Sequence, residues 1–123
     1  MQPQSKTQTT QNKNRIVLVG GLAPSIFENY KELIIYYKKI SLDELRELAR
    51  NAEVMNYVRH ESTVKLLSSI LNRDLTPNAG LYTWREGDVL VVVGLRKPIR
   101  GQEVEVRADD LDLVLCKIEV IGQ

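Results

Sequence analysis

Two short runs of consecutive apolar residues constrain the fold of this chain more than any other feature. The first extends from Ile16 to Val19, and the second extends from Val89 to Leu95. A strand that faces water on one side alternates apolar and polar residues, whereas an unbroken apolar run is typical of a strand covered on both faces. The sequence therefore predicts a sheet that has these two strands in its interior.

The segments between these runs alternate between strand and helix patterns. Lys31 to Ile40 is rich in β-branched and aromatic residues, which favours a strand. Ser41 and Glu44 have the spacing of a capping box, which predicts the start of a helix. A short strand is expected from Glu53 onward, and the apolar spacing after His60 predicts a second helix.

The rest of the chain is expected to complete the sheet. Leu81 to Trp84 is predicted to be a short strand that forms a hairpin with the strand from Val89 to Leu95. Residues 108–112 are predicted to form one helical turn, and Leu113 to Ile121 the closing strand. This order indicates the α/β class, with a small mixed β-sheet of about five strands and two or three flanking helices.

The chain is predicted to consist of a tail and one domain. From Gln2 to Asn14 it contains no large apolar residue. Such a segment buries too little surface to offset the entropy lost on ordering, so residues 1–14 are expected to be a disordered polar tail. Residues 15–123 are expected to form a single α/β domain that is long enough to bury a core.

The composition disfavours several functional classes. Lys and Arg number 17 against 16 Asp and Glu, so the net charge of +1 gives no support for broad binding to DNA. One histidine and one cysteine disfavour a zinc site within a single chain. The lone Cys116 allows no intrachain disulfide, and no signal peptide or membrane-spanning apolar stretch is evident. A cytoplasmic location without a membrane or a metal is therefore expected.

His60 is the single histidine and lies between the predicted strand and the second helix. Ser62 and Thr63 then fall in the first turn of that helix, where backbone N–H groups lack partners and favour an anion. A group that can transfer protons beside a phosphate site is the minimum equipment for cleaving an RNA phosphodiester. A structural or simply solvated histidine is the alternative interpretation.

Two further segments are candidate ligand contacts. Gly20 and Gly21 follow the first apolar run, where they form either a tight turn or a close approach of the backbone to a ligand. A basic cluster, formed by Arg96, Lys97 and Arg100, could contact phosphates. The alternative interpretation of this cluster is an exposed loop.

Several motifs taken together resemble the viral ring nucleases that inhibit type III CRISPR immunity. The resemblance covers about residues 15–121 and rests on four segments: residues 58–71 around His60, Pro77-Asn78, Glu86-Gly87-Asp88 before an apolar strand, and Arg96-Lys97-Pro98. It implies a two-fold homodimer that binds cyclic tetraadenylate. The expected activity is metal-independent cleavage of that ring to linear diadenylates with 2′,3′-cyclic phosphate ends, in the cytoplasm of an infected host cell and with no cofactor.

The resemblance also implies roles for individual residues. His60 would be the catalytic general acid, because an imidazole that titrates near neutrality can protonate the departing 5′-oxygen. The expected substrate-binding residues are Gly20, Gly21, Arg59, Ser62, Thr63, Asn78 and Arg96.

The sequence departs from the family pattern at positions that would contact the ligand. Arg59 stands where glycine is usual, Ala79 where arginine is usual and Ile99 where glutamate is usual, while Gly20 and Gly21 replace an asparagine. The turnover rate and the preferred ring size therefore stay open. Two alternatives remain beside the nuclease: a protein that binds the cyclic oligoadenylate without efficient cleavage, and a dimeric DNA-binding viral regulator.

Overall fold

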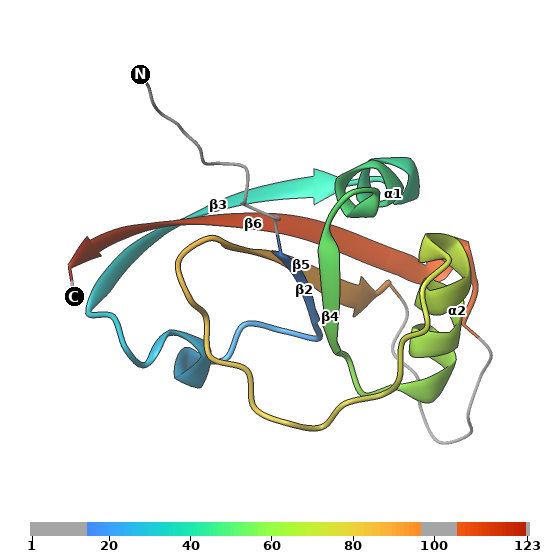
Figure 1. Ribbon diagram of the computed structural model, residues 1–123, viewed down its shortest axis with the longest axis horizontal. Helices are drawn as coiled ribbons and strands as arrows, with labels where there is room; N and C mark the ends of the chain where they lie inside the picture. The colour runs from blue at the N-terminus through green and yellow to red at the C-terminus, as the bar shows by residue number, and fades with distance from the viewer. Residues whose placement is uncertain (1–14, 97–105, 123) are drawn as a thin grey trace.

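The computed structural model describes residues 15–96 and 106–122 (Figure 1). The predicted tail at residues 1–14 lies outside them, as do Lys97, Ile99 and Arg100. The strands are β2 (Arg15–Val19), β3 (Glu32–Ile40), β4 (Glu53–Tyr57), β5 (Asp88–Leu95) and β6 (Leu111–Gly122). The helices are α1 (Leu42–Ala49) and α2 (Glu61–Leu71), with short 3-10 helices η1 (Pro24–Phe27) and η2 (Ala108–Asp110).

The five strands form one mixed sheet in the order β3-β6-β5-β2-β4. β2 pairs in parallel with both β4 and β5, whereas β6 pairs antiparallel with β5 and β3. The predicted α/β fold with a small mixed sheet is confirmed. The two apolar runs are the adjacent strands β2 and β5, which have neighbours on both edges.

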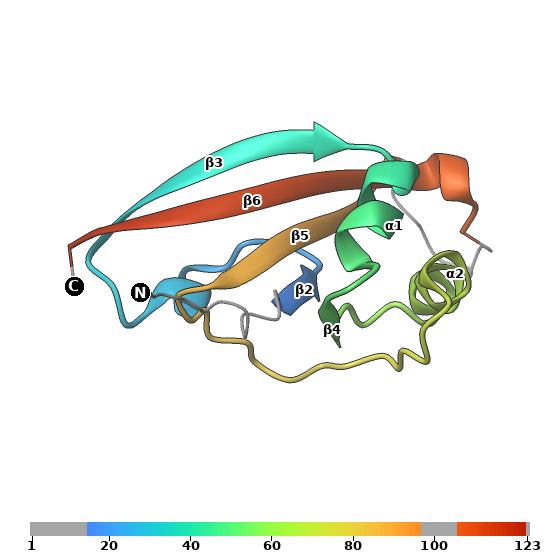
Figure 2. The same ribbon diagram turned by 45° about the horizontal axis from the view of Figure 1, so that its top comes forward.

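Each face of the sheet is covered by a different part of the chain (Figure 2). Both α-helices lie on one face, where Leu45 of α1 and Leu67 of α2 belong to the same buried cluster as Leu18 of β2. On the other face, Ile26 of η1 and Trp84 pack against the alternate side chains of the strands. Burial on both faces explains why β2 and β5 have no polar residue in their apolar runs.

α1 begins at the capping box that the sequence predicts. The N–H of Glu44 donates to Ser41 Oγ at 3.1 Å, and the N–H of Ser41 donates to Glu44 Oε1 at 3.0 Å. This second hydrogen bond lowers the pKa of the Glu44 carboxyl group. The cap thereby satisfies a backbone donor that the first turn would otherwise leave without a partner.

The predicted hairpin between Leu81–Trp84 and the next strand is wrong. β5 has β2 on one edge and β6 on the other, so neither edge is available to residues 81–84. That segment instead crosses a face of the sheet, with Tyr82 and Trp84 buried and Leu81 88% exposed. The aromatic residues of this segment pack against the sheet and do not belong to a paired strand.

β3 forms one edge of the sheet and is largely exposed. Ile34 and Tyr36 are exposed on the side of the helices, and Ile35 and Tyr37 are exposed on the other side. β3 and β6 extend together beyond the helices (Figures 1 and 2). This strand therefore presents apolar and aromatic side chains that the described part of the chain leaves uncovered.

Candidate functional site

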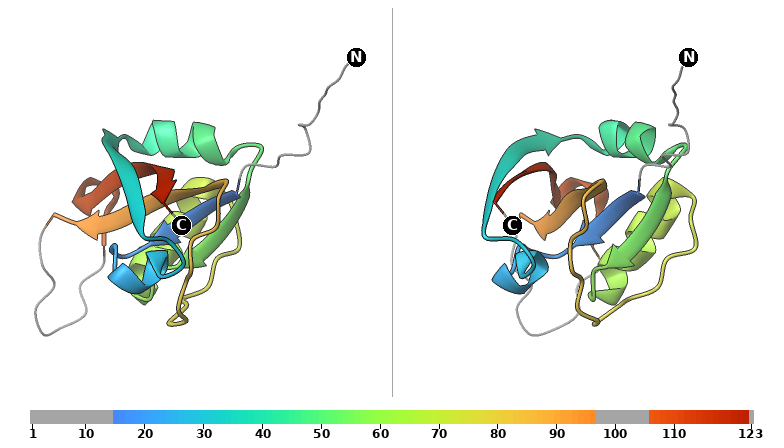
Figure 3. Two further views of the ribbon diagram at one scale, coloured as in Figure 1. Left: turned by 90° about the vertical axis from the view of Figure 1, so that its left-hand side faces the viewer. Right: turned by 60° about the vertical axis from the view of Figure 1, so that its left-hand side comes forward.

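The carboxyl ends of β2 and β4 meet at one edge of the sheet. Val19 lies opposite Tyr57 in the parallel pair, so Gly20 and Arg59 follow the two strands at neighbouring positions. Figure 3 shows β2 and β4 side by side, with their arrowheads at the same edge. In open α/β sheets this edge is where ligands bind, because loops of different strands converge there.

His60 begins α2 as its N-cap residue. Its Nδ1 accepts a hydrogen bond from the backbone N–H of Thr63 at 3.3 Å and lies 2.9 Å from Thr63 Oγ1. A neutral ring that accepts at Nδ1 carries its hydrogen at Nε2. A half-buried imidazole held in this way keeps Nε2 as its donor, and His60 itself is not among the residues that line the hollow described below. His60 thus has a structural role, because its Nδ1 caps α2. Its Nε2 takes no part in this cap.

Ser62 and Thr63 use their side chains inside the protein. Ser62 Oγ accepts from the N–H of Val106 at 2.9 Å, and Thr63 is 2% exposed with its hydroxyl against His60. The donors that this helix start offers to an anion are therefore backbone N–H groups, those of Glu61 and Ser62.

Asn78 holds the segment after α2 against the end of β4. Its Nδ2 donates to the carbonyl of Asn56 at 3.1 Å, and its backbone N–H donates to the carbonyl of Val58 at 3.1 Å. Its Oδ1 accepts from the N–H of Gly80 at 2.8 Å. These contacts make Asn78 a residue that positions the loop beside Arg59.

A hollow of about 520 Å³ opens at this edge, and three of the predicted contact residues line it: Gly20, Gly21 and Arg59. Tyr57, Leu81 and Tyr82 line it too. Sequence reasoning did not select these three residues, although the position of Tyr57 at the end of a strand, two residues before Arg59, was a usable signal. Arg96 lines a different hollow, of about 360 Å³, so the structure does not bring it together with Arg59.

Gly20 and Gly21 are open to the hollow rather than constrained by the fold. A Cβ added at either residue would meet no atom within 4 Å. Among the described glycines, Gly87 alone has a positive φ, at 98°, so no left-handed turn requires glycine at 20 or 21. The fold therefore tolerates a side chain at either position, and close approach of a ligand to the backbone stays a prediction.

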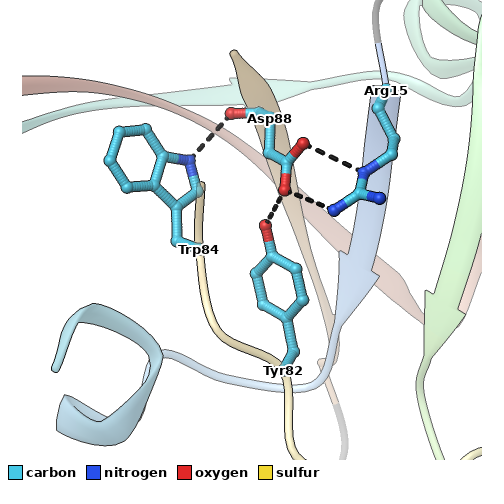
Figure 4. A network of polar contacts seen from close by, with 4 residues as sticks. All are labelled: Arg15, Tyr82, Trp84 and Asp88. Carbon is cyan, nitrogen blue, oxygen red and sulfur yellow. Dashed lines mark hydrogen bonds and ion pairs between the residues drawn. The ribbon is translucent and has the colours of Figure 1, made fainter. Parts of the chain in front are cut away.

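A polar network holds Tyr82, one of the residues that line the hollow (Figure 4). The guanidinium of Arg15 donates to both carboxylate oxygens of Asp88, at 3.0 and 2.8 Å, and the hydroxyl of Tyr82 donates to Asp88 Oδ2. Trp84 Nε1 donates to the carbonyl of Asp88 at 2.9 Å. Burial, followed by the hydrogen bond to Asp88, raises the pKa of Tyr82 well above its ordinary value.

The fold and this edge define a class of small α/β proteins with one mixed five-stranded sheet and a ligand-sized hollow at the ends of its parallel strands. The chain belongs to the STIV B116-like family, whose sequence model matches residues 16–119.

Two viral proteins are similar to this chain, one in sequence and one in fold. The chain is 26% identical over 84 residues to Uncharacterized protein 26 of Sulfolobus islandicus filamentous virus (isolate Iceland/Hveragerdi), which covers 68% of this chain and 71% of that protein. The fold of this chain is similar to that of B116 of Sulfolobus turreted icosahedral virus, with a TM-score of 0.60 and 14% identity. That match covers 83% of this chain and 97% of B116.

Within residues 15–96 and 106–122, no group of three or more His, Cys, Asp and Glu side chains is placed to hold a metal ion. None of the helices in the same part of the chain is long and apolar enough to cross a membrane.

Proposed function

We propose that this protein is a metal-independent ring nuclease that cleaves cyclic tetraadenylate to linear diadenylates with 2′,3′-cyclic phosphate ends, and so suppresses type III CRISPR immunity. The observation that carries the proposal is the geometry of His60. Its Nδ1 is occupied by Thr63, and its Nε2 is the donor that remains. Arg59, the preceding residue, lines a ligand-sized hollow at the same edge.

The cleavage step uses the ribose as nucleophile. The 2′-oxygen attacks the adjacent phosphorus, the bond from phosphorus to the 5′-oxygen breaks, and the 5′-oxygen takes a proton from Nε2 of the protonated His60 ring, which is left neutral. The proton of the 2′-hydroxyl passes to solvent. Arg59 and the first-turn N–H groups of α2 would stabilise the negative charge that develops on the non-bridging oxygens.

Thr63 suits a histidine that changes its protonation state. In the neutral ring, Nδ1 accepts from the N–H of Thr63. In the protonated ring, Nδ1 carries a hydrogen and can donate to Thr63 Oγ1, which lies 2.9 Å away. One residue can therefore hold the ring in one orientation before and after proton transfer.

A homodimer would match the two-fold symmetry that a cyclic tetranucleotide can adopt, and it would supply two copies of His60 for two cuts. The exposed edge strand β3 also favours pairing with another chain, because its apolar side chains are uncovered. β3 lies at the opposite edge of the sheet from β4, so this contact would keep the two copies of His60 apart and is distinct from the contact that would share one ring. Antiparallel self-pairing centred on Ile35 would set Glu32 opposite Lys38 and Leu33 opposite Tyr37, so charges and apolar groups would be complementary.

The decisive experiment compares wild type, His60→Ala and His60→Asn on cyclic tri-, tetra- and hexaadenylate in EDTA, with the products separated by chromatography. Asparagine can still cap α2 but cannot act as a general acid, so His60→Asn separates chemistry from folding. Wild type should cleave the tetraadenylate, and both variants should lose about 100-fold or more in rate while they still bind it. A ring in which deoxyribose replaces ribose should resist cleavage.

Other outcomes would identify the alternatives. Tight binding by wild type with the ring recovered intact would indicate a protein that sequesters the messenger. Cleavage by His60→Asn at the wild-type rate would refute the assignment of the general acid. DNA affinity that falls steeply with salt, without affinity for cyclic oligoadenylates, would indicate a DNA-binding regulator.

A further inference from the structure

We propose that the hollow beside Arg59 is a base-binding subsite, in which one purine stacks on Tyr57 while Arg59 holds the attached phosphate. The subsite is defined by Tyr57, Tyr82, Gly20, Gly21 and Arg59. The inference depends on the proposed function for one point, that the purine is an adenine of a cyclic oligoadenylate. The subsite itself would bind any adenine nucleotide.

Two tyrosines form an aromatic wall in this hollow. Tyr57 ends β4 and is half-buried, and its ring centroid lies 5.2 Å from that of Tyr82 at an interplanar angle of 49°. Tyr82 is held in place because its hydroxyl donates to Asp88, at the other end of the ring from the sheet edge (Figure 4). A fixed ring that supports a partly exposed ring is suited to base stacking, which proteins use to bind unpaired nucleotides.

The glycine side of the hollow leaves room for a flat ligand. Side chains at 20 and 21 would extend into open space, since an added Cβ meets nothing within 4 Å at either residue. The hollow measures about 520 Å³, which falls within the range of about 300–1,000 Å³ for small-molecule sites. The two glycine positions therefore leave the hollow open to a planar purine.

Arg59 connects this subsite to the proposed chemistry. It is exposed, it lines the hollow, and it directly precedes His60. A guanidinium binds phosphate through paired hydrogen bonds. A nucleotide with its base against Tyr57 and its phosphate on Arg59 would thus have that phosphate near the start of α2, where His60 caps the helix.

Binding of 2-aminopurine riboside 5′-monophosphate tests the subsite without any cleavage, because the emission of this base analogue falls when it stacks on an aromatic ring. The informative variants are Tyr57→Leu, Tyr57→Phe, Gly21→Leu and Arg59→Gln. Arg50→Gln is the matched control, since Arg50 is exposed at the end of α1 and outside the hollow. Thermal unfolding of each variant checks that it is folded.

We expect Tyr57→Leu and Gly21→Leu to weaken binding at least about five-fold and to reduce the quenching of emission. Tyr57→Phe and Arg50→Gln should bind as wild type does, and Arg59→Gln should weaken binding while the bound base stays quenched. Wild-type affinity and quenching in folded Tyr57→Leu and Gly21→Leu would overturn the subsite. Recovery of the intact ring after incubation with wild type would instead overturn the nuclease and leave the subsite standing.

Discussion

Thr63 contacts His60 through two of its own groups, a backbone N–H 3.3 Å from Nδ1 and a hydroxyl 2.9 Å from the same nitrogen. The first contact caps α2, and the second fixes the rotation of the imidazole ring. Because Thr63 is almost completely buried, water does not readily replace either contact.

Thr63→Val should reveal how much the hydroxyl of Thr63, apart from the rest of its side chain, contributes to the cleavage rate. Valine preserves the shape and the backbone N–H but removes the oxygen that accepts from protonated Nδ1. We expect cleavage of cyclic tetraadenylate to slow by about 10-fold with little change in ring binding, because ring orientation rather than affinity is affected. Single-turnover rates measure this effect, and Thr63→Ser should restore most of the activity. Equal rates for wild type and Thr63→Val would remove Thr63 from the mechanism.

The stability of α2 should depend on the cap at position 60. His60→Ala removes the acceptor of the Thr63 N–H, and the loss of an N-cap costs about 0.5–2 kcal/mol. His60→Asn should stay close to the wild-type free energy of unfolding, because asparagine is a good N-cap residue. Urea denaturation followed by circular dichroism gives both values. Equal stability of the two variants would contradict the capping role.

Substitution by alanine should change the stability of the fold at Gly87 but not at Gly20. Gly87 has a φ of 98°, which strains any residue with a Cβ, so Gly87→Ala should destabilise the fold by about 1 kcal/mol or more. Gly20→Ala should leave the free energy of unfolding nearly unchanged, since its Cβ would project into open space. Thermal denaturation of the two variants provides the comparison. A large loss of stability in Gly20→Ala would show that the fold, rather than a ligand, requires this glycine.

Tyr82 should make stability fall at alkaline pH. Burial and the hydrogen bond to Asp88 raise the pKa of Tyr82 in the folded state above that of the unfolded chain. The contribution of Tyr82 to the free energy of unfolding is therefore complete below about pH 10, the ordinary tyrosine pKa, and is lost as the pH rises beyond that value. Tyr82→Phe should cost about 1 kcal/mol at neutral pH and show a smaller alkaline loss than wild type. Urea unfolding at pH 8 and pH 11 measures both, and identical alkaline losses would refute the assignment.

The edge strand β3 should control the oligomeric state. Ile35→Lys places a charge at the centre of the proposed pairing without disturbing a buried residue, as Ile35 is 38% exposed. We expect a larger assembly for wild type than for folded Ile35→Lys in light scattering coupled to size-exclusion chromatography. Ser69→Lys on the exposed face of α2 is the matched surface control. An assembly of unchanged mass in Ile35→Lys would move the contact away from β3.

Part of the site could be predicted from the sequence because its signals are local. The start of α2 after His60 follows from apolar spacing, and the bend at Gly20 and Gly21 follows from two glycines after a buried strand. The environment of Ser62 was not predictable, since its hydroxyl accepts from Val106 on a segment that is distant in the chain. The same holds for Tyr82, whose position depends on Asp88 and Arg15.

By itself, the sequence determined the elements of this protein: the two apolar runs became the buried strands β2 and β5, and the pattern of Ser41 and Glu44 became the start of α1. Those features depend on burial and hydrogen bonding within a few residues, so a local pattern encodes them. Only the tertiary structure decided that residues 81–84 cover the sheet instead of joining it, that Arg96 faces a separate hollow and that Tyr57 meets Tyr82. Strand order and loop contacts join residues far apart in the chain, and no local pattern specifies which of them will meet.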